Sequence, residues 1–227
     1  MNLLFVVGPW GEKAHVAHVD RKQTIARPLH LEALPPFTDV QHTIVKPLEK
    51  TAHLETIYPA PSDTFIPEFY HPVLFAYRLQ DSSDALYSQA VDRIKASLSK
   101  VLVTFFSFAG RWVAVAAGSP RRKLLCNDEG VPFIEAKMGD TDLDAIVKAS
   151  TAFQPVPELL GHRFLGRTIF TQQLPEDGSG LPPIFVQVTR FGCGGLTMGV
   201  TFNPMHVDGD AFFKFMKKSW SQYVESC

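Results

Sequence analysis

The chain has 227 residues, with 22 basic and 23 acidic side chains, and its formal net charge is −1. This balance excludes nucleic acid and an anionic membrane surface as the main partner, because both select strongly basic proteins. Hydrophobic residues make up 45% of the chain and 18 residues are phenylalanine, which indicates a thick core or an apolar channel.

The three cysteines, Cys126, Cys193 and Cys227, are widely spaced and form no CxxC pair. Neither a metal site nor a disulfide framework is therefore expected, and a reducing, cytoplasmic location is the simpler interpretation. Cys126 and Cys193 lie beside predicted strands, so we expect both thiols to be buried. No apolar run approaches the roughly 18 residues that a membrane helix requires, which predicts no membrane span.

Residues 1–40 differ from the rest of the chain, because their charges are scattered and no period is sustained after Val7. We interpret this segment as a poorly specified N-terminal extension. Beyond it, a strand is predicted over 42–47, ended by Pro47, and a second over 73–79, which is rich in aromatic and β-branched residues.

A helix is predicted over residues 84–103. Ser82, Ser83 and Asp84 supply N-cap chemistry before it. Apolar residues recur behind them at helical spacing and form one stripe. The stripe consists of Leu86, Ala90, Ile94, Leu98 and Val101. The sequence Ala109-Gly110-Arg111 ends the helical region.

Three strands are predicted next, over 111–117, 123–126 and 131–136. The turn of residues 127–130, with the sequence NDEG, joins the second strand to the third. We therefore expect the three strands to form an antiparallel meander.

The last third of the chain begins with a predicted short helix over 142–149, followed by proline-bearing loops. A hairpin of strands over 183–191 and 196–202 comes next, and a phenylalanine-rich helix begins near Asp208. This order of elements predicts an α+β fold with a mixed, mostly antiparallel sheet and flanking helices.

The stretch 199–210 carries the candidate chemistry, because an apolar strand there ends in a polar turn with one histidine and two aspartates. Histidine is the usual general base at neutral pH, so His206 is the candidate base. The alternative is a loop histidine with Asp208 or Asp210 serving only as a helix N-cap. No G-x-S-x-G elbow occurs, which favours direct transfer over a covalent enzyme intermediate.

From about Gln41 onward the chain resembles the N-terminal half of the plant BAHD acyltransferases, which depend on acyl-CoA. Several blocks in the same order carry the resemblance. They are FYHPVLFAY at 69–77, LSKVLV through FAGR at 98–111, CNDEGVPFIEA at 126–136, VQVTRFGCGG at 186–195, and Asp208-Gly209 with the aromatic helix and Trp220.

The resemblance implies one domain of the two-domain chloramphenicol-acetyltransferase-like fold, with residues 41–227 as the N-terminal acyltransferase domain and the C-terminal domain absent. It implies transfer of an acyl group from acyl-CoA, as co-substrate rather than bound cofactor, to a hydroxyl or amine acceptor. The family's DFGWG motif does not occur in the chain. A protein partner that covers the exposed domain interface is then an expected consequence.

The family's HxxxDG motif departs from its pattern in this sequence. Aligned without gaps on Asp208-Gly209, the family's histidine position is Pro204, and His206 lies two residues later. His206 and Asp210 also satisfy HxxxD, but Ala211 then replaces the glycine. In the ungapped register Asp208 is the structural aspartate and Asp210 its alternative. A catalytically inactive or truncated family member, acting as a binding protein or without a separate role, is the competing hypothesis.

Overall fold

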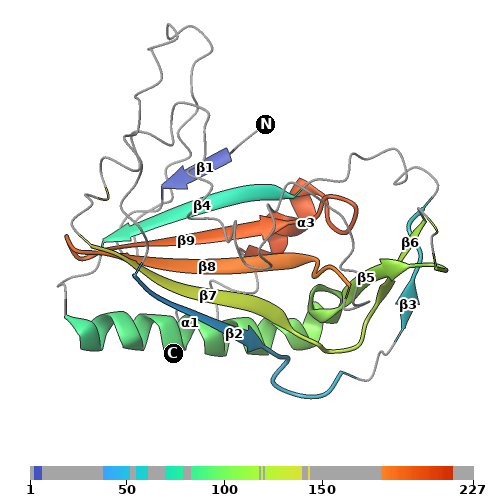
Figure 1. Ribbon diagram of the computed structural model, residues 1–227, viewed down its shortest axis with the longest axis horizontal. Coiled ribbons are helices and arrows are strands. Elements are labelled where there is room, and N and C mark those ends of the chain that lie inside the picture. Colours follow the sequence, from blue (N-terminus) through green and yellow to red (C-terminus); the bar gives the residue numbers. More distant parts are fainter. Residues whose placement is uncertain are drawn as a thin grey trace, which may run out of the picture.

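The computed structural model describes residues 3–6, 38–51, 55–60, 70–78, 83–117, 119, 121–139, 143 and 180–216. A six-stranded sheet with the order β1-β4-β9-β8-β7-β2 dominates this part of the chain (Figure 1). Its strands are β1 (Leu3–Val6), β2 (Thr38–Val45), β4 (His71–Arg78), β7 (Val131–Met138), β8 (Ile184–Phe191) and β9 (Gly195–Phe202).

The large sheet is mixed, as the sequence predicts. Antiparallel pairs join β4 to β9, β9 to β8 and β7 to β2, whereas β1 runs parallel to β4 and β7 parallel to β8. The β8–β9 hairpin pairs Ile184 with Phe202 and Arg190 with Leu196, so the predicted hairpin is confirmed. Strand β1 lies inside the segment predicted as an extension, and it forms one edge of the sheet.

A second, small sheet has the order β3-β6-β5, and the predicted meander is wrong at this point. Strands β5 (Arg111–Ala114) and β6 (Arg122–Leu125) pair antiparallel, and β3 (Thr56–Ile57) adds to β6. Strand β7 does not fold back on β6. It enters the large sheet between β2 and β8 instead.

Long-range polar contacts redirect the chain between β6 and β7. The Asp128 carboxylate accepts hydrogen bonds from the Thr51 amide, at 2.8 Å, and from the Thr51 hydroxyl, at 2.7 Å. Arg111, which is 7% exposed, donates to the Gly130 carbonyl oxygen at 2.7 Å and pairs with Glu129 at 2.9 Å. These contacts fix the turn in a conformation that does not pair β7 with β6. The continuous apolar start of β7 is typical of a strand that is buried on both faces.

Helix α1 (Asp84–Thr104) packs along one face of the large sheet (Figure 1), and its predicted N-cap is confirmed: the Ser83 hydroxyl accepts from the Leu86 amide. Ile94, Leu98 and Val101 are buried as expected. Near the start of the helix, however, Tyr87 and Val91 are buried in place of Leu86 and Ala90, because the larger Tyr87 side chain joins the core cluster. The short 3-10 helix η2 (Phe106–Ala109) follows.

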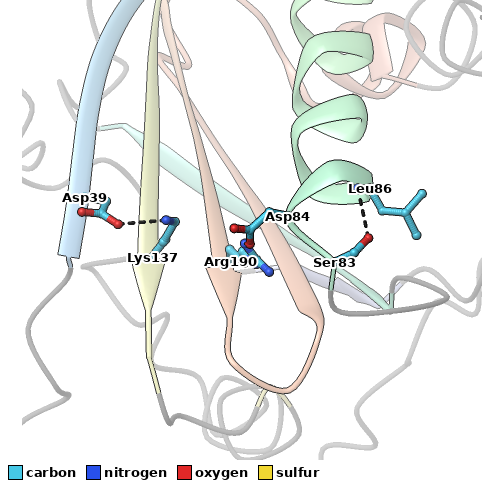
Figure 2. A network of polar contacts seen from close by, with 6 residues as sticks. All are labelled: Asp39, Ser83, Asp84, Leu86, Lys137 and Arg190. Carbon is cyan, nitrogen blue, oxygen red and sulfur yellow. Dashed lines mark hydrogen bonds and ion pairs between the residues drawn. The ribbon is translucent and has the colours of Figure 1, made fainter.

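Two ion pairs lie near the start of α1, one between the helix and β8 and one between β7 and β2. Figure 2 shows the Arg190 guanidinium of β8 against the Asp84 carboxylate of α1, and the Lys137 ammonium of β7 against the Asp39 carboxylate of β2, 2.9 Å apart. Because these carboxylates are exposed to solvent, the pairs contribute little to stability. The Arg190–Asp84 pair joins the start of α1 to β8, and the Lys137–Asp39 pair joins β7 to β2.

The main core lies between the large sheet on one side and α1 and α3 (Gly209–Lys214) on the other. Phe212 of α3 stacks on Phe202 of β9, with ring centroids 4.2 Å apart. A smaller core cluster under the second sheet contains Trp112, Leu124, Cys126 and Leu181, with Phe106 and Met205 packed against it.

Some predicted features are corrected or fall outside the described residues. Cys126 is buried as expected, but Cys193 is exposed, because it lies in the tight turn between β8 and β9. The predicted 142–149 helix lies outside the described residues apart from Leu143, and so does the final helix beyond residue 216. Among the described helices, none combines the length and apolar character that a bilayer crossing needs.

Candidate active site

The turn that joins β9 to α3 is built around Asn203. Its amide donates to the Pro183 carbonyl oxygen at 2.9 Å, which ties the end of β9 to the start of β8. Pro204, Met205 and His206 form the turn, and Val207 returns to the main core at 6% exposure. The turn therefore spans two apolar clusters, with Met205 against the small one and Val207 in the large one.

His206 lies against two aromatic rings from distant parts of the chain. Its imidazole meets the Phe108 ring of η2 edge-on, with centroids 4.9 Å apart at 87°, and the Trp112 ring of β5 at 6.1 Å and 79°. Within the described ranges, no carboxylate hydrogen bonds or pairs with this imidazole. The ring is partly buried in an apolar environment, without the acidic partner that commonly fixes a catalytic histidine.

Burial lowers the pKa of His206 to about 4, since an apolar environment disfavours the imidazolium form. The imidazole is consequently neutral at physiological pH and has a free nitrogen lone pair. The folded protein binds this proton less readily than the unfolded chain. Above pH 6.5 His206 therefore does not reduce the free energy of unfolding. As the pH falls from 6.5 towards 4, the unfolded chain takes up the proton first and the free energy of unfolding decreases.

Asp208 and Asp210 occupy different positions at the start of α3. Asp208 is the N-cap residue, and its carboxylate accepts a hydrogen bond from the Ala211 amide at 2.7 Å. Asp210 lies in the first helical turn and forms an exposed ion pair with Lys214. Neither carboxylate bonds to His206.

Replacing Asp208 by alanine is expected to lower the free energy of unfolding by about 1 kcal/mol, since the Ala211 amide loses its acceptor. Asp210→Ala is the matched control, and it should change stability less, because it removes only an exposed ion pair. Urea denaturation followed by circular dichroism measures both. A larger effect from Asp210→Ala would contradict the assignment of Asp208 as the cap.

The structure brings His206 and Asp208 into one turn, with Pro204 partly exposed before them. Sequence reasoning missed Asn203, Phe108 and Trp112 as neighbours of the candidate base. The dipeptide Asn203-Pro204 was a usable signal, because Asn-Pro initiates turns. No local signal connected His206 to two rings roughly a hundred residues earlier in the chain.

A comparison with protein families identifies the chain. A sequence model of the Transferase family matches residues 36–226, which is most of the chain. The chain belongs to the BAHD acyltransferase family. The predicted resemblance is thereby confirmed.

Curated BAHD relatives from plants match the same region. The chain is 32% identical over 184 residues to hydroxycinnamoyl-CoA:piscidic acid hydroxycinnamoyltransferase of Actaea racemosa, covering 79% of this chain and 36% of that protein. It is 35% identical over 151 residues to (Z)-3-hexen-1-ol acetyltransferase of Arabidopsis thaliana, covering 66% of this chain and 30% of that one. The chain thus spans about 30–36% of the length of these two curated relatives.

Solved structures of the family share the fold. Vinorine synthase superposes with a TM-score of 0.58 at 24% identity, covering 85% of this chain and 43% of that one. TRI101 of F. sporotrichioides, crystallised with coenzyme A and T-2, superposes with a TM-score of 0.59 at 16% identity. The match covers 76% of this chain and 39% of that one. The predicted α+β fold of the chloramphenicol-acetyltransferase type is confirmed.

Proposed function

We propose that this BAHD chain takes part in the transfer of an acyl group from acyl-CoA to a hydroxyl or amine, with His206 accepting the proton of the acceptor. The observation that carries the proposal is the position of His206 in the turn between the end of β9 and the Asp208 N-cap of α3. The names of curated relatives support both acceptor classes, since one relative in Avena sativa is an N-hydroxycinnamoyltransferase and another in Arabidopsis thaliana acetylates (Z)-3-hexen-1-ol.

The proposed step is a direct transfer. A neutral imidazole nitrogen removes the proton from the acceptor as its oxygen or nitrogen attacks the thioester carbonyl carbon. The new bond to carbon forms, the carbon–sulfur bond breaks, and the leaving thiolate takes the proton back from the imidazolium. Acyl-CoA is a co-substrate in this scheme, and no resident cofactor is required.

Two further parts of the proposal concern the frame around His206. Asp208 holds the start of α3 and thereby the turn, with Asp210 as the alternative aspartate. Residues 41–227 form the acyltransferase domain, which acts in the cytoplasm together with a protein partner.

A second candidate function is non-catalytic binding by a BAHD protein that has lost turnover. Pro204 at the family's histidine position favours it, because proline has no side chain that accepts a proton. The low pKa of His206 favours it too, since the contribution of a general base falls as its pKa drops below the working pH.

The two candidates differ in the turnover of the purified chain. With hydroxycinnamoyl-CoA or acetyl-CoA and a panel of alcohols and amines, thiol release measures acyl transfer. If His206 is the base, His206→Ala should reduce the rate by about a hundredfold or more. The rate of the unsubstituted protein should stay flat from about pH 5 upward, because a base with a pKa of about 4 is already neutral there.

His42→Ala serves as the matched control, because His42 is exposed on the edge strand β2 and should leave the rate unchanged. Equal rates for His206→Ala and the unsubstituted protein would reject His206 as the base. Acyl-CoA binding without any turnover across the panel would instead establish the second candidate.

A further inference from the structure

Asn203 accepts a hydrogen bond from every backbone N–H of the turn that carries His206. Pro204 has no N–H, so the turn of residues 204–207 has amides only at Met205, His206 and Val207. The Asn203 carbonyl oxygen accepts from His206 at 3.0 Å and from Val207 at 3.4 Å. Its side-chain oxygen Oδ1 accepts from Met205 at 2.9 Å.

The orientation of the Asn203 amide follows from these contacts. Only its oxygen can accept from the Met205 N–H, so Nδ2 points the other way. The Tyr70 hydroxyl lies beside this amide and donates to the Pro182 carbonyl oxygen at 2.7 Å. Nδ2 itself makes no well-directed hydrogen bond among the described residues. Asn203 is only 1% exposed, so its oxygen atoms serve the turn in place of water.

This arrangement links Asn203 to the place of the His206 ring. The backbone of the turn is anchored at Asn203, which is itself tied to β8 through Pro183. The His206 side chain lies against the Phe108 and Trp112 rings. Loss of Oδ1 would leave the part-buried Met205 amide without its acceptor, which favours a rearranged turn.

We propose that Asn203 is the positioning residue of this site: its side-chain Oδ1 accepts from the Met205 amide, adds to the two bonds that its carbonyl oxygen accepts, and so holds the His206 imidazole against Phe108 and Trp112. The catalytic meaning of this role rests on the proposed function of His206. The positioning itself does not depend on turnover, and it is tested by a property of the imidazole.

The test is the titration of the His206 imidazole in the full chain, followed by nuclear magnetic resonance. In the unsubstituted protein the pKa of His206 is expected at about 4. In Asn203→Ala the Met205 amide loses its acceptor, the ring gains contact with water, and the pKa should rise by about 1 unit or more towards 6.5. Asn203→Ser should restore most of the low value, because a serine hydroxyl can accept from the amide two residues on.

Asn127→Ala is the matched control, because it removes an asparagine side chain that bonds to Glu129 in a different turn. It should leave the titration of His206 unchanged. An unshifted pKa in Asn203→Ala would overturn the proposal, and so would equal shifts in the alanine and serine variants. If neither the unsubstituted protein nor any variant transfers acyl groups while the pKa shifts are as expected, the proposed function is rejected and the positioning role of Asn203 is retained.

Hydrogen exchange in the unsubstituted protein provides a second measurement that does not depend on the folding of a variant. The amides of Met205, His206 and Val207 should exchange more slowly than the exposed amide of Gly209, because each is bonded to Asn203. Exchange of the Met205 amide at the rate of an unstructured peptide would overturn the proposal.

Discussion

Phe212→Ala is expected to lower the free energy of unfolding by about 3–5 kcal/mol, which is the usual cost of removing a fully buried phenylalanine. Phe212 has 0% exposure, and its ring stacks on Phe202 at 4.2 Å with an interplanar angle of 18°. The cavity would open between β9 and α3, the two elements that hold the turn of His206. We therefore expect the variant to weaken the candidate site as well as the core.

Phe213→Ala is the matched control for this prediction, because the neighbouring ring is of the same type but only partly buried. Its loss of stability should be roughly half or less of that of Phe212→Ala. Urea denaturation of both variants, followed by tryptophan fluorescence, measures the difference. Equal losses would contradict the orientation in which α3 presents Phe212 to the sheet.

Gly130→Ala is expected to lower the free energy of unfolding by about 3–4 kcal/mol, through backbone strain and a steric clash together. Gly130 has a φ of 92°, a conformation that alanine adopts only with strain. A Cβ atom there would lie 2.6 Å from the Val45 carbonyl oxygen and 2.8 Å from the Ile44 side chain, so β2 would have to move away from β7. Because both neighbours belong to a paired strand, the clash has no low-cost relief.

Gly139→Ala is the control for Gly130→Ala, since an added Cβ atom at Gly139 would meet no atom within 4 Å. Thermal unfolding followed by circular dichroism should show a large decrease in melting temperature for Gly130→Ala and a small change for Gly139→Ala. A tolerated alanine at position 130 would mean that the turn before β7 is not held as described.

Much of the secondary structure could be predicted from local patterns. The Ser83 cap, the apolar repeat of α1 and the Gly-rich turn between β8 and β9 each depend on residues a few positions apart. The family could also be recognised, because blocks such as CNDEGVPFIEA and VQVTRFGCGG preserve their order along the chain. Asp208 was identified as a possible N-cap for the same local reason.

The partner of β7 and the environment of His206 could not be predicted in this way. Strand β7 does not join the expected meander, because hydrogen bonds hold the turn before it. These bonds involve Arg111, Thr51 and Asp128 and span up to 77 residues of sequence. The sequence predicts His206 as a candidate base at the end of a strand, but it does not predict its contacts with the Phe108 and Trp112 rings or the burial that lowers the pKa of its imidazole.

The sequence of this protein thus specifies its helices, strands and caps, because hydrogen bonds and side-chain periodicity within one element involve near neighbours. Residues far apart in the chain decide which strands pair. They also decide the pKa of the His206 imidazole. Those properties arise from desolvation and long-range hydrogen bonds, which exist only once the sheets and α3 have come together.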